Sequence, residues 1–332
     1  MTKQRAEMTE FVKGKRFVVT GGAGFIGSHL VDALLNQGAD HVTVVDNFFL
    51  GKDANLTSAR EQHGDKVTVF REDAGDFEAM RAILGEARAD VVFNLATKAL
   101  LYSFFNPAGA ARVNTDIAYT LADLLRAGAY GRLIQFSTSE VYGTAQTVPM
   151  TEEHPLMAET SYAAGKAAAD LVLASYANMF GLDIGIIRPF NNYGPRQNDG
   201  NMAAIIPLTV RRICENRRPV IEGDGLQTRD FIFVRDTIEA TLKLTALATL
   251  TGLIVNVGSG KETSIKEIIG SVCQEMEYSG TIEHKPARPA DVRRHCADVG
   301  LMHSLIGEMV TTPLHDGIAQ TVEPLTRGSI HP

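Results

Sequence analysis

The sequence predicts an α/β protein built on a doubly wound parallel sheet, followed by a smaller mixed α/β domain. Short apolar runs alternate with stretches of helical length as far as residue 187, as in consecutive βαβ units. A glycine-rich turn joins the first run to the first helical stretch, and beyond residue 188 the pattern becomes irregular. We therefore expect residues 1–187 to form one domain and residues 188–332 a second, with part of 230–258 returning to the first sheet.

The stretch RFVVTGGAGFIGS at residues 16–28 organises the first domain. Gly21 allows a tight strand-to-helix turn, Gly24 lets the backbone approach a diphosphate, and Gly27 lets the helix press against the sheet. Free N–H groups at the helix start, with the helix dipole behind them, favour the negative charge of a diphosphate. The turn therefore predicts a Rossmann-type dinucleotide site that includes Gly21, Gly24, Phe25, Ile26 and Gly27.

An acidic residue ends the second predicted strand. The apolar run His41–Val45 leads to Asp46, 19 residues after Gly27. A carboxylate there accepts a hydrogen bond from a ribose 2′-hydroxyl and repels a 2′-phosphate, which favours NAD over NADP. A solvated Asp after an ordinary helix entry is the alternative. The order of strand, glycines, helix, strand and Asp favours the cofactor site, with Asn47 beside it.

Two acidic residues follow the third predicted strand, Val67–Phe70. Asp73, followed by Ala74, is placed to meet the adenine amino group. Asp76 suits the N-cap of the helix that begins FEAMRAIL, and the two roles are compatible.

The alternation of strand and helix continues to residue 187. The strand in DVVFNLA leads to Leu95 and Ala96, where the backbone passes a cofactor. Because the carboxyl ends of parallel strands share one edge, the residues after each strand should line one crevice. Expected in this part are strands 90–95, 132–136 and 183–187 and helices 107–128 and 161–180. Beyond a loop at 188–201 we expect strands 220–222, 230–233 and 253–257, and helices 204–216, 236–250, 264–278 and 298–306.

The composition is that of an ordinary globular enzyme, with 45% hydrophobic and 21% charged residues and a net charge of −7. The absence of a strongly basic stretch argues against nucleic acid and anionic membranes as partners. Cys214, Cys273 and Cys296 form no short-spaced pair, so we expect a reducing compartment and no metal. The N-terminus has no apolar signal-peptide core and no stretch reaches membrane-spanning length, so we expect a cytoplasmic protein.

Tyr162 and Lys166 stand four residues apart on the alanine-rich helix, so both project from one face. Near an ammonium and a nicotinamide cation the pKa of the phenol should fall. The phenolate then takes a proton from a sugar hydroxyl while hydride leaves to NAD, and Thr138 offers its hydroxyl to the same oxygen. A Tyr and a Lys at this spacing on a helix are commonly solvent-exposed residues without a catalytic role. A cofactor motif upstream favours a catalytic set here.

At these residues the sequence resembles the extended short-chain dehydrogenase/reductase family, specifically its nucleotide-sugar epimerases, dehydratases and decarboxylases. The resemblance covers nearly the whole chain, through TGGAGFIGSHL, DVVFNLA, STSEVYG, SYAAGK, RPFNNYGPRQ, QTRDFIFVRD and ARPADVRRHCAD. It implies a nucleotide-diphosphate sugar as substrate, Tyr162 as the catalytic base and Lys166 on the nicotinamide ribose. It also implies Asp46 and Asp73 on the adenosine.

The resemblance further implies that Asn191, Arg229 and Arg288 contact the diphosphate or the sugar. Two guanidiniums suit a diphosphate on an otherwise acidic protein. An ion pair with Asp230 or Asp236 is the alternative for Arg229. Lys98 and Ser139 are further substrate candidates. Lys98 is open to three interpretations, a substrate carboxylate, Glu140 or solvent, of which solvent is preferred. Arg293 and Arg294, further along the same motif as Arg288, suit the protein surface.

Family members first oxidise the C4 hydroxyl of the sugar, and later steps depend on added residues. Glu140 stands where 4,6-dehydratases carry the base that removes the C5 proton. Glucose-type dehydratases have Asp before that Glu, whereas this chain has Ser139, as in mannose-type dehydratases and UDP-glucuronate decarboxylases. We predict an NDP-hexose 4,6-dehydratase, with UDP-glucuronate decarboxylase, NDP-sugar 4-epimerase and a non-catalytic NAD-binding scaffold as alternatives. Glu140 as an acceptor for backbone amides is the structural alternative.

Family members commonly dimerise through a four-helix bundle. The helix from Pro107 and the alanine-rich helix can pack closely against a twofold mate, so we expect a homodimer.

Overall fold

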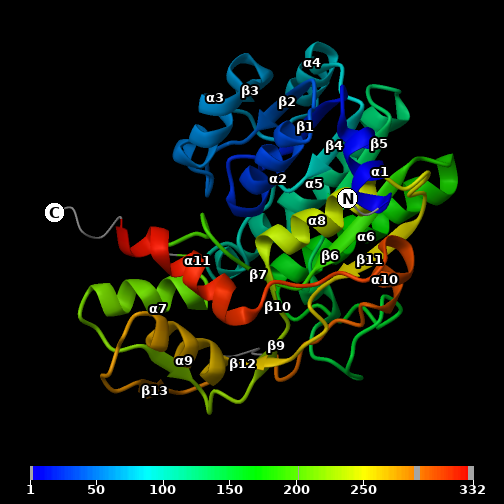
Figure 1. Cartoon of the computed structure of the whole chain (residues 1–332). Coiled ribbons are helices and arrows are strands. Elements are labelled where there is room, and N and C mark those ends of the chain that lie inside the picture. Colours follow the sequence, from blue (N-terminus) through cyan, green and yellow to red (C-terminus); the bar gives the residue numbers. More distant parts are fainter. Residues whose placement is uncertain (1–2, 201, 288–291, 328–332) are drawn as a thin grey trace.

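A seven-stranded parallel sheet forms the centre of the larger part of the computed structural model, which describes residues 3–200, 202–287 and 292–327 (Figure 1). The strand order is β11-β6-β5-β4-β1-β2-β3. The chain runs outward from β1 to β3 and then crosses to β4 on the other side of β1, so the order reverses between β1 and β4, where such sheets bind ligands. The strands are β1 (Arg16–Thr20), β2 (His41–Val45), β3 (Val67–Phe70), β4 (Val91–Asn94), β5 (Arg132–Phe136), β6 (Ile184–Pro189) and β11 (Leu253–Val257).

Helices cover both faces of this sheet, because its strands are apolar on both sides. Alternate residues of β1 show this: Phe17 and Val19 belong to one buried cluster, and Val18 belongs to the cluster on the opposite face. The first cluster is covered by α1 (Lys3–Val12), α2 (Phe25–Asn36), α3 (Thr57–His63), α8 (Val234–Thr245) and α10 (Gly300–Ile306). The second is covered by α4 (Phe77–Ala87), α5 (Pro107–Arg126) and α6 (Ser161–Phe180).

The smaller part lies below the carboxyl edge of the sheet in Figure 1 and combines three helices with short strand pairs. Its core joins Tyr193, Ile206, Ile268 and Ile318 from four different elements. The helices are α7 (Ile205–Cys214), α9 (Ile265–Glu275) and α11 (Leu314–Arg327). The strand pairs are β7 (Asn191–Tyr193) with β10 (Phe231–Phe233), β9 (Thr228–Arg229) with β12 (Thr263–Ser264), and β8 (Val220–Glu222) with β13 (Glu283–Lys285).

The predicted doubly wound sheet is confirmed, and the differences lie in short or terminal elements. The expected loop at 188–201 contains β7, which pairs with β10. α8 was expected at 236–250. It begins earlier, at Val234, because β10 runs directly into it, and it ends at Thr245. α1 and α11 were not expected. α11 contains Gly317 and Pro324, which disfavour a helix, yet the burial of its apolar side chains against α7 and α9 holds it.

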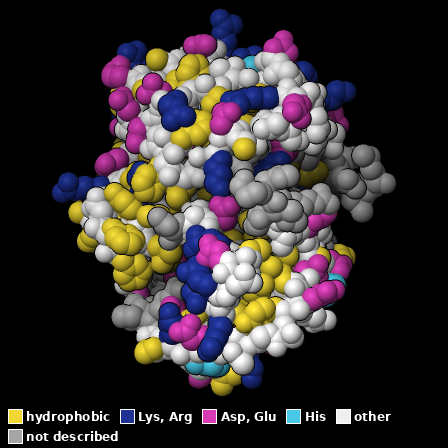
Figure 2. Space-filling model, turned by 90° about the vertical axis from the view of Figure 1, so that its left-hand side faces the viewer, with side chains coloured by type: hydrophobic (Ala, Val, Ile, Leu, Met, Phe, Trp, Pro, Cys, Tyr) yellow, Lys and Arg dark blue, Asp and Glu magenta, His cyan; other side chains and the backbone are white. Residues whose placement is uncertain are grey.

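Four 3₁₀ turns complete the described elements: η1 (Asp53–Leu56), η2 (Gly64–Lys66), η3 (Leu100–Phe104) and η4 (Ser139–Tyr142). Within the described ranges no helix is long and apolar enough to cross a membrane. On the face shown in Figure 2, basic and acidic side chains lie interspersed, and hydrophobic side chains gather toward one edge. This view fits the modest negative net charge of the sequence.

Candidate active site

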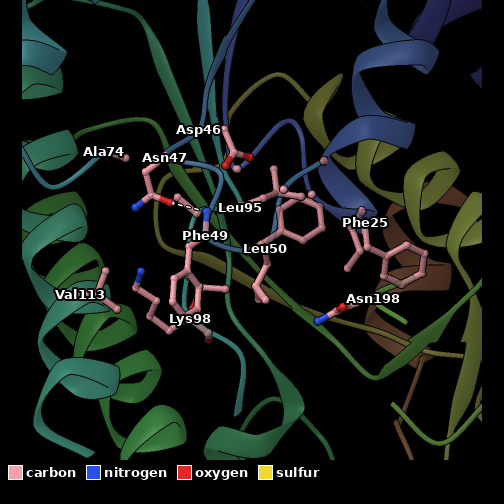
Figure 3. Close-up of a pocket in the computed structure, with 18 of the residues that line it drawn as sticks. Phe25, Asp46, Asn47, Phe49, Leu50, Ala74, Leu95, Lys98, Val113 and Asn198 are labelled. Carbon is pink, nitrogen blue, oxygen red and sulfur yellow. Dashed lines mark hydrogen bonds between the residues drawn. The ribbon is translucent and has the colours of Figure 1, made fainter. Parts of the chain in front are cut away.

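A cavity of about 360 Å³ opens at the carboxyl edge of the sheet, where the strand order reverses. Figure 3 shows Asp46 and Asn47 on one side of it and Phe49 and Lys98 below them. All the side chains and glycines that we assigned to the cofactor line this cavity: Gly21, Gly24, Phe25, Ile26, Gly27, Asp46, Asn47, Asp73, Ala74, Leu95, Ala96 and Lys166. Thr138, Tyr162 and Lys98 line it as well.

The glycine turn between β1 and α2 is as tight as its sequence indicates. Gly21 has φ +69°, a conformation that side chains disfavour. A Cβ on Gly27 would lie 2.2 Å from the carbonyl oxygen of Gly21, so a side chain there would force the turn and the helix apart. Gly24 is the N-cap of α2, and no side chain caps this helix. The first N–H groups of α2 therefore meet the cavity without a side-chain acceptor in the way.

Asp46 is held by the backbone at the end of β2. Its Oδ2 accepts a hydrogen bond from Ala23 N at 3.0 Å and its Oδ1 from Phe48 N at 2.8 Å. Burial raises the pKa of this carboxyl, while the two N–H donors and Arg71 oppose the rise. Each oxygen keeps a further lone pair, so the fixed carboxylate can accept from ribose hydroxyls.

Asp73 and Asp76 divide the two roles that the sequence left open. The side chain of Asp76 accepts from Ala79 N and caps α4. Asp73 lines the cavity, where Oδ1 accepts from Gly75 N at 2.8 Å and Oδ2 from Asn47 Nδ2 at 3.2 Å.

Tyr162 and Lys166 lie at the start of α6 with Thr138 facing them from the end of β5. The Thr138 hydroxyl lies close enough to the phenol of Tyr162 to lower its pKa. Lys166 is buried, and its Nζ donates to the carbonyl oxygen of Phe136 at 2.8 Å. The backbone N–H of Tyr162 donates to Ser103 Oγ at 2.9 Å, which fixes the first turn of α6 against η3. The structure thus brings the predicted triad together at one cavity.

The protein groups around Tyr162 act against the predicted phenolate. We predicted that an ammonium together with a nicotinamide cation lowers the pKa of Tyr162. In the protein alone, burial, followed by the negative charge of Glu140, raises the pKa of this phenol, and Thr138 opposes them only in part. Burial also lowers the pKa of Lys166 to about 8, and the charge of Asp170 counteracts this. The protein groups by themselves therefore keep the phenol protonated.

Neither of the two residues after Thr138 lines either cavity, and their side chains have different surroundings. Glu140 is half-buried in η4, its N–H donates to Thr138 Oγ1 at 3.2 Å, and its charge acts on the Tyr162 phenol. Ser139 was expected to contact substrate. It is 2% exposed and its Oγ lies 3.4 Å from His295 Nδ1, so it faces away from the cavity. His295 lies 156 residues further along the chain, and no local sequence pattern signalled this contact.

A second cavity of about 380 Å³ lies between the sheet edge and the smaller part. Asn191 and Arg229 line it, and Asn192 and Gln197 line both cavities. Arg229 Nη1 donates to the carbonyl oxygens of Thr228 and Val292. The structure therefore separates Asn191 and Arg229 from the cofactor residues, and Arg288, the third predicted substrate contact, lies outside the described residues.

Three side-chain oxygens at this second cavity lack a hydrogen-bond partner within the described part of the chain. They are Asn191 Oδ1, Asn192 Oδ1 and Gln197 Oε1, and all are buried. Buried polar groups are normally satisfied by protein, water or ligand. The second cavity is therefore suited to a ligand rich in hydrogen-bond donors, such as a sugar.

Lys98 does not point to solvent, which corrects the preferred interpretation of this residue. Its Nζ lies 3.5 Å from the centroid of the Phe49 ring and 5.8 Å from that of Tyr102. These cation–π contacts hold the ammonium over the cavity. Phe49 was not predicted, although a large aromatic residue in a polar loop was a signal. Other cavity residues missed from the sequence include Leu50, Lys52, Arg196 and Asn198.

The remaining basic candidates are surface residues. Arg293 pairs with Asp224 at 2.8 Å and Arg294 with Glu262 at 2.5 Å, and both guanidiniums are more than half exposed. Across the described residues, no group of three or more His, Cys, Asp or Glu side chains is arranged to hold a metal ion.

Comparison with known proteins places this geometry among nucleotide-sugar enzymes. Residues 18–321 match the model of a family described as GDP-mannose 4,6-dehydratase. The UDP-glucose 4-epimerase of Mycolicibacterium smegmatis is 34% identical over 310 residues, covering 93% of this chain and 97% of the relative. The UDP-N-acetyl-α-D-glucosaminuronate decarboxylase of Bacillus cytotoxicus is 34% identical over 280 residues, covering 82% and 84%. These two relatives are named for different reactions.

A solved structure gives the same result. The dTDP-glucose 4,6-dehydratase of Streptomyces venezuelae, crystallised with NAD, superposes with a TM-score of 0.87 at 29% identity, covering 94% of this chain and 97% of the other. The architecture thus matches an enzyme with bound cofactor, and the reactions of these relatives span epimerisation, decarboxylation and dehydration.

Proposed function

The chain belongs to the GDP-mannose 4,6-dehydratase family of extended short-chain dehydrogenases/reductases, and we propose that it is an NAD-dependent 4,6-dehydratase of a nucleotide-diphosphate hexose. The observation that carries this proposal is the juxtaposition at the end of β5. The Thr138 hydroxyl and the Glu140 carboxylate both lie close enough to the Tyr162 phenol to influence its pKa, in opposite directions. A base for the C4 hydroxyl and a base for C5 then lie together.

The first cavity fits NAD. Asp46 and Asp73 would hold the adenosine, the start of α2 the diphosphate, and Lys166 the nicotinamide ribose. The free N–H groups of α2 and the backbone-held carboxylate of Asp46 support this placement. When bound, NAD supplies the acceptor for the C4 hydride and a positive charge that favours the phenolate.

The second cavity would hold the nucleotide-diphosphate sugar. Arg229 offers a guanidinium to the diphosphate, and the unpartnered oxygens of Asn191, Asn192 and Gln197 can accept from hydroxyl or amide groups. Because Asn192 and Gln197 line both cavities, a sugar held there extends toward Tyr162. In this arrangement residues 1–187 serve mainly the cofactor and residues 188–332 mainly the substrate.

Tyr162 takes the proton of the C4 hydroxyl, with Thr138 stabilising the phenolate through its hydrogen bond. The resulting 4-ketone makes the C5 hydrogen acidic, and Glu140 removes it. Glu140 then carries the proton that the C6 hydroxyl needs to leave as water, because Ser139 is bonded to His295 and faces away. Completion of the 4-keto-6-deoxy product would need the hydride at C6 and a proton at C5, and the proton that Tyr162 took from the C4 hydroxyl balances the latter.

A decarboxylase is the second candidate, and Lys98 favours it. A UDP-glucuronate substrate carries a carboxylate at C6, and the Lys98 ammonium lies over the first cavity, next to residues of η3 that line the second. After oxidation at C4 the substrate is a β-keto acid, which loses carbon dioxide without a base at C5. A 4-epimerase would use the same first step and return the hydride to the opposite face.

The test is to incubate the protein and NAD with UDP-, dTDP-, GDP- and CDP-sugars and to analyse the products by mass spectrometry and NMR. The proposal expects loss of water from one hexose substrate and exchange of its C5 hydrogen with solvent deuterium. Loss of carbon dioxide from a uronate, or an unchanged mass with altered ring couplings, would overturn it in favour of the decarboxylase or the epimerase. An intact sugar across the whole panel would favour the NAD-binding scaffold.

A second copy of the chain is the partner we propose. α5 and α6 pack on each other and expose large apolar side chains, namely Tyr119, Leu171, Met179 and Phe180. Burying them against the same helices of a twofold mate forms a four-helix bundle. Light scattering should give the mass of a dimer, and Leu171→Glu should yield a monomer; a monomeric wild-type protein would contradict the proposal.

A further inference from the structure

A buried carboxylate lies behind the triad on the same helix. Asp170 stands one turn after Lys166 on α6 and is 1% exposed. Its Oδ2 accepts hydrogen bonds from Ser137 Oγ at 2.8 Å and from Arg188 Nε at 3.0 Å. Its Oδ1 is buried and has no hydrogen-bond partner within the part of the chain that the structure describes.

Charged and titratable groups surround this carboxylate from several elements. Arg188 on β6 faces it directly, and Arg188 Nη1 donates to the Tyr142 hydroxyl of η4 at 3.0 Å and to the carbonyl oxygen of Glu152 at 3.3 Å. On α6, the charge of Asp170 raises the pKa values of Lys166 and Tyr162, and the charge of Glu140 also raises that of Tyr162. Glu152 acts on Tyr142 from the loop beyond.

A second Arg–Asp ion pair, at the opposite ends of β5 and β6, serves as a comparison for the Arg188–Asp170 pair. Arg132, which begins β5, pairs with Asp183, just before β6, at 2.6 Å. There Asp183 Oδ1 accepts from Leu250 N and Oδ2 from Arg132, so both oxygens are bonded. Asp170 is more deeply buried and leaves one oxygen unbonded.

A buried ion pair is weak evidence for stability, because desolvation offsets its attraction, and an unbonded buried oxygen adds to the cost. If Asp170 only stabilised the fold, we would expect both of its oxygens to be hydrogen-bonded, as those of Asp183 are. Lys166 is a second buried cation near Asp170: it stands one turn earlier on α6, and its Nζ contacts Phe136, next to the Ser137 that donates to Asp170.

We propose that Asp170 is a positioning residue that keeps Lys166 protonated in its buried place, so that the ammonium can hold the nicotinamide ribose and favour the phenolate of Tyr162. This inference rests on the proposed function, because it takes Lys166 and Tyr162 as working groups. It assigns Asp170 a role exerted through Lys166 and not through contact with the substrate.

The contacts of Lys166 explain why it needs this help. Its Nζ donates to the carbonyl oxygen of Phe136, a neutral acceptor that also receives Gln135 Nε2 at 3.2 Å. Burial lowers the pKa of Lys166 to about 8, and the Asp170 charge is the influence that raises it. With an uncharged residue at position 170 the ammonium would lose its proton at a lower pH.

The test compares Asp170→Asn with the matched control Asp183→Asn. NAD affinity is measured by calorimetry between pH 6 and pH 10, and kcat/KM on the sugar nucleotide that the panel identifies. In the wild type, NAD affinity should fall as the pH rises through about 8. In Asp170→Asn the fall should occur about one pH unit lower. Asp183→Asn should keep the wild-type midpoint, and Asp170→Glu should restore it.

The double variant Asp170→Asn with Arg188→Gln covers the case in which the single variant does not fold, because it leaves no unpaired buried guanidinium. The proposal expects the same displaced midpoint in the double variant. A wild-type midpoint there, or a loss in Asp170→Asn that is equal at every pH, would overturn the proposal and make Asp170 a partner of Arg188 alone. Tyr162→Phe separates the two proposals: full turnover in that variant contradicts the proposed function, whereas an inactive Tyr162→Phe with an unmoved Asp170→Asn profile contradicts only this inference.

Discussion

The two cavities meet at Asn192 and Gln197 but are built in different ways. The first lies on the ends of continuous parallel strands, and its carboxylate, Asp46, is held by two backbone N–H groups. The second is framed by short strand pairs and loops joined through Asp230, whose carboxylate accepts from Ser259, Gly260 and Ala297. Its wall also contains buried oxygens without a partner in the described residues.

This difference indicates which cavity is fixed by the protein alone and which one depends on its ligand. Backbone N–H groups just beyond β1 and β2 fix the Asp46 carboxylate of the first cavity without a ligand. The oxygens of Asn191 in the second cavity, and of Asn192 and Gln197 where the two cavities meet, are left for a ligand to satisfy, and each unbonded group costs about 1 to 3 kcal/mol when nothing binds it. Substitutions in the first cavity should therefore affect folding or chemistry, and those in the second should affect substrate affinity.

Tyr162→Phe should have the largest effect, because it removes the proposed base of the first cavity and keeps the aromatic ring of this residue. We expect kcat to fall by about a thousandfold or more while NAD affinity stays within a fewfold of the wild type. Steady-state kinetics and calorimetry on the same preparation check this. Thermal unfolding serves as the control for folding, and a variant with more than a tenth of wild-type activity would contradict the role of Tyr162.

Gly27→Ala should have the next largest effect, a decrease in the free energy of unfolding. The added Cβ would lie 2.2 Å from the carbonyl oxygen of Gly21, so the turn must shift, at about 3 kcal/mol. Gly24→Ala is the matched control, because its Cβ would meet the same oxygen at 3.1 Å. Denaturant unfolding should rank the two variants in this order, and NAD affinity should suffer in Gly24→Ala; equal stabilities would show that the turn is more pliant than its geometry indicates.

Arg229→Met changes a residue of the second cavity and should therefore affect substrate affinity. If Arg229 binds the diphosphate as proposed, we expect KM for the sugar nucleotide to rise roughly tenfold or more, while NAD affinity remains unchanged. Arg293→Met, which removes an exposed guanidinium paired with Asp224, is the control and should leave KM unchanged. A loss of NAD affinity in Arg229→Met would show that the two cavities are not functionally separate.

The smallest effect concerns pH and the buried ammonium of the first cavity. The folded chain holds the pKa of Lys166 at about 8, below the 10.5 of an exposed lysine, so between these pH values the unfolded chain binds more protons. The free energy of unfolding should therefore rise with pH in this window, by on the order of 1 kcal/mol between pH 8 and pH 9. Lys166→Met should lack this rise in denaturant unfolding, and an identical slope in both proteins would contradict it.

Local patterns in the sequence were sufficient for the first cavity, because strand ends and the glycine turn depend on residues that are neighbours in the chain. Gly21, Asp46 and Asp73 were placed correctly in this way. Contacts between distant segments were not predictable. Lys98 lies over Phe49 and Ser139 against His295 because tertiary packing brings their segments together.

The same limit explains what was missed in the fold. α11 carries Gly317 and Pro324, so its local preference opposes a helix. It forms because Ile318 and Val322 are buried with residues of α7 and α9. The rise in the pKa of Tyr162 in the protein alone was not predictable for a related reason, since burial of the phenol and the charge of Glu140 depend on the whole fold.

The most direct test of the central claim is to follow reduced nicotinamide by stopped-flow absorbance after mixing the NAD-loaded Glu140→Gln protein with the sugar nucleotide. Because Tyr162 and Thr138 remain in place, oxidation at C4 should proceed and the later proton transfer should stop. The account predicts that reduced cofactor accumulates and no dehydrated sugar forms. Dehydrated product at the wild-type rate, or no reduced cofactor at all from a folded variant, would contradict it.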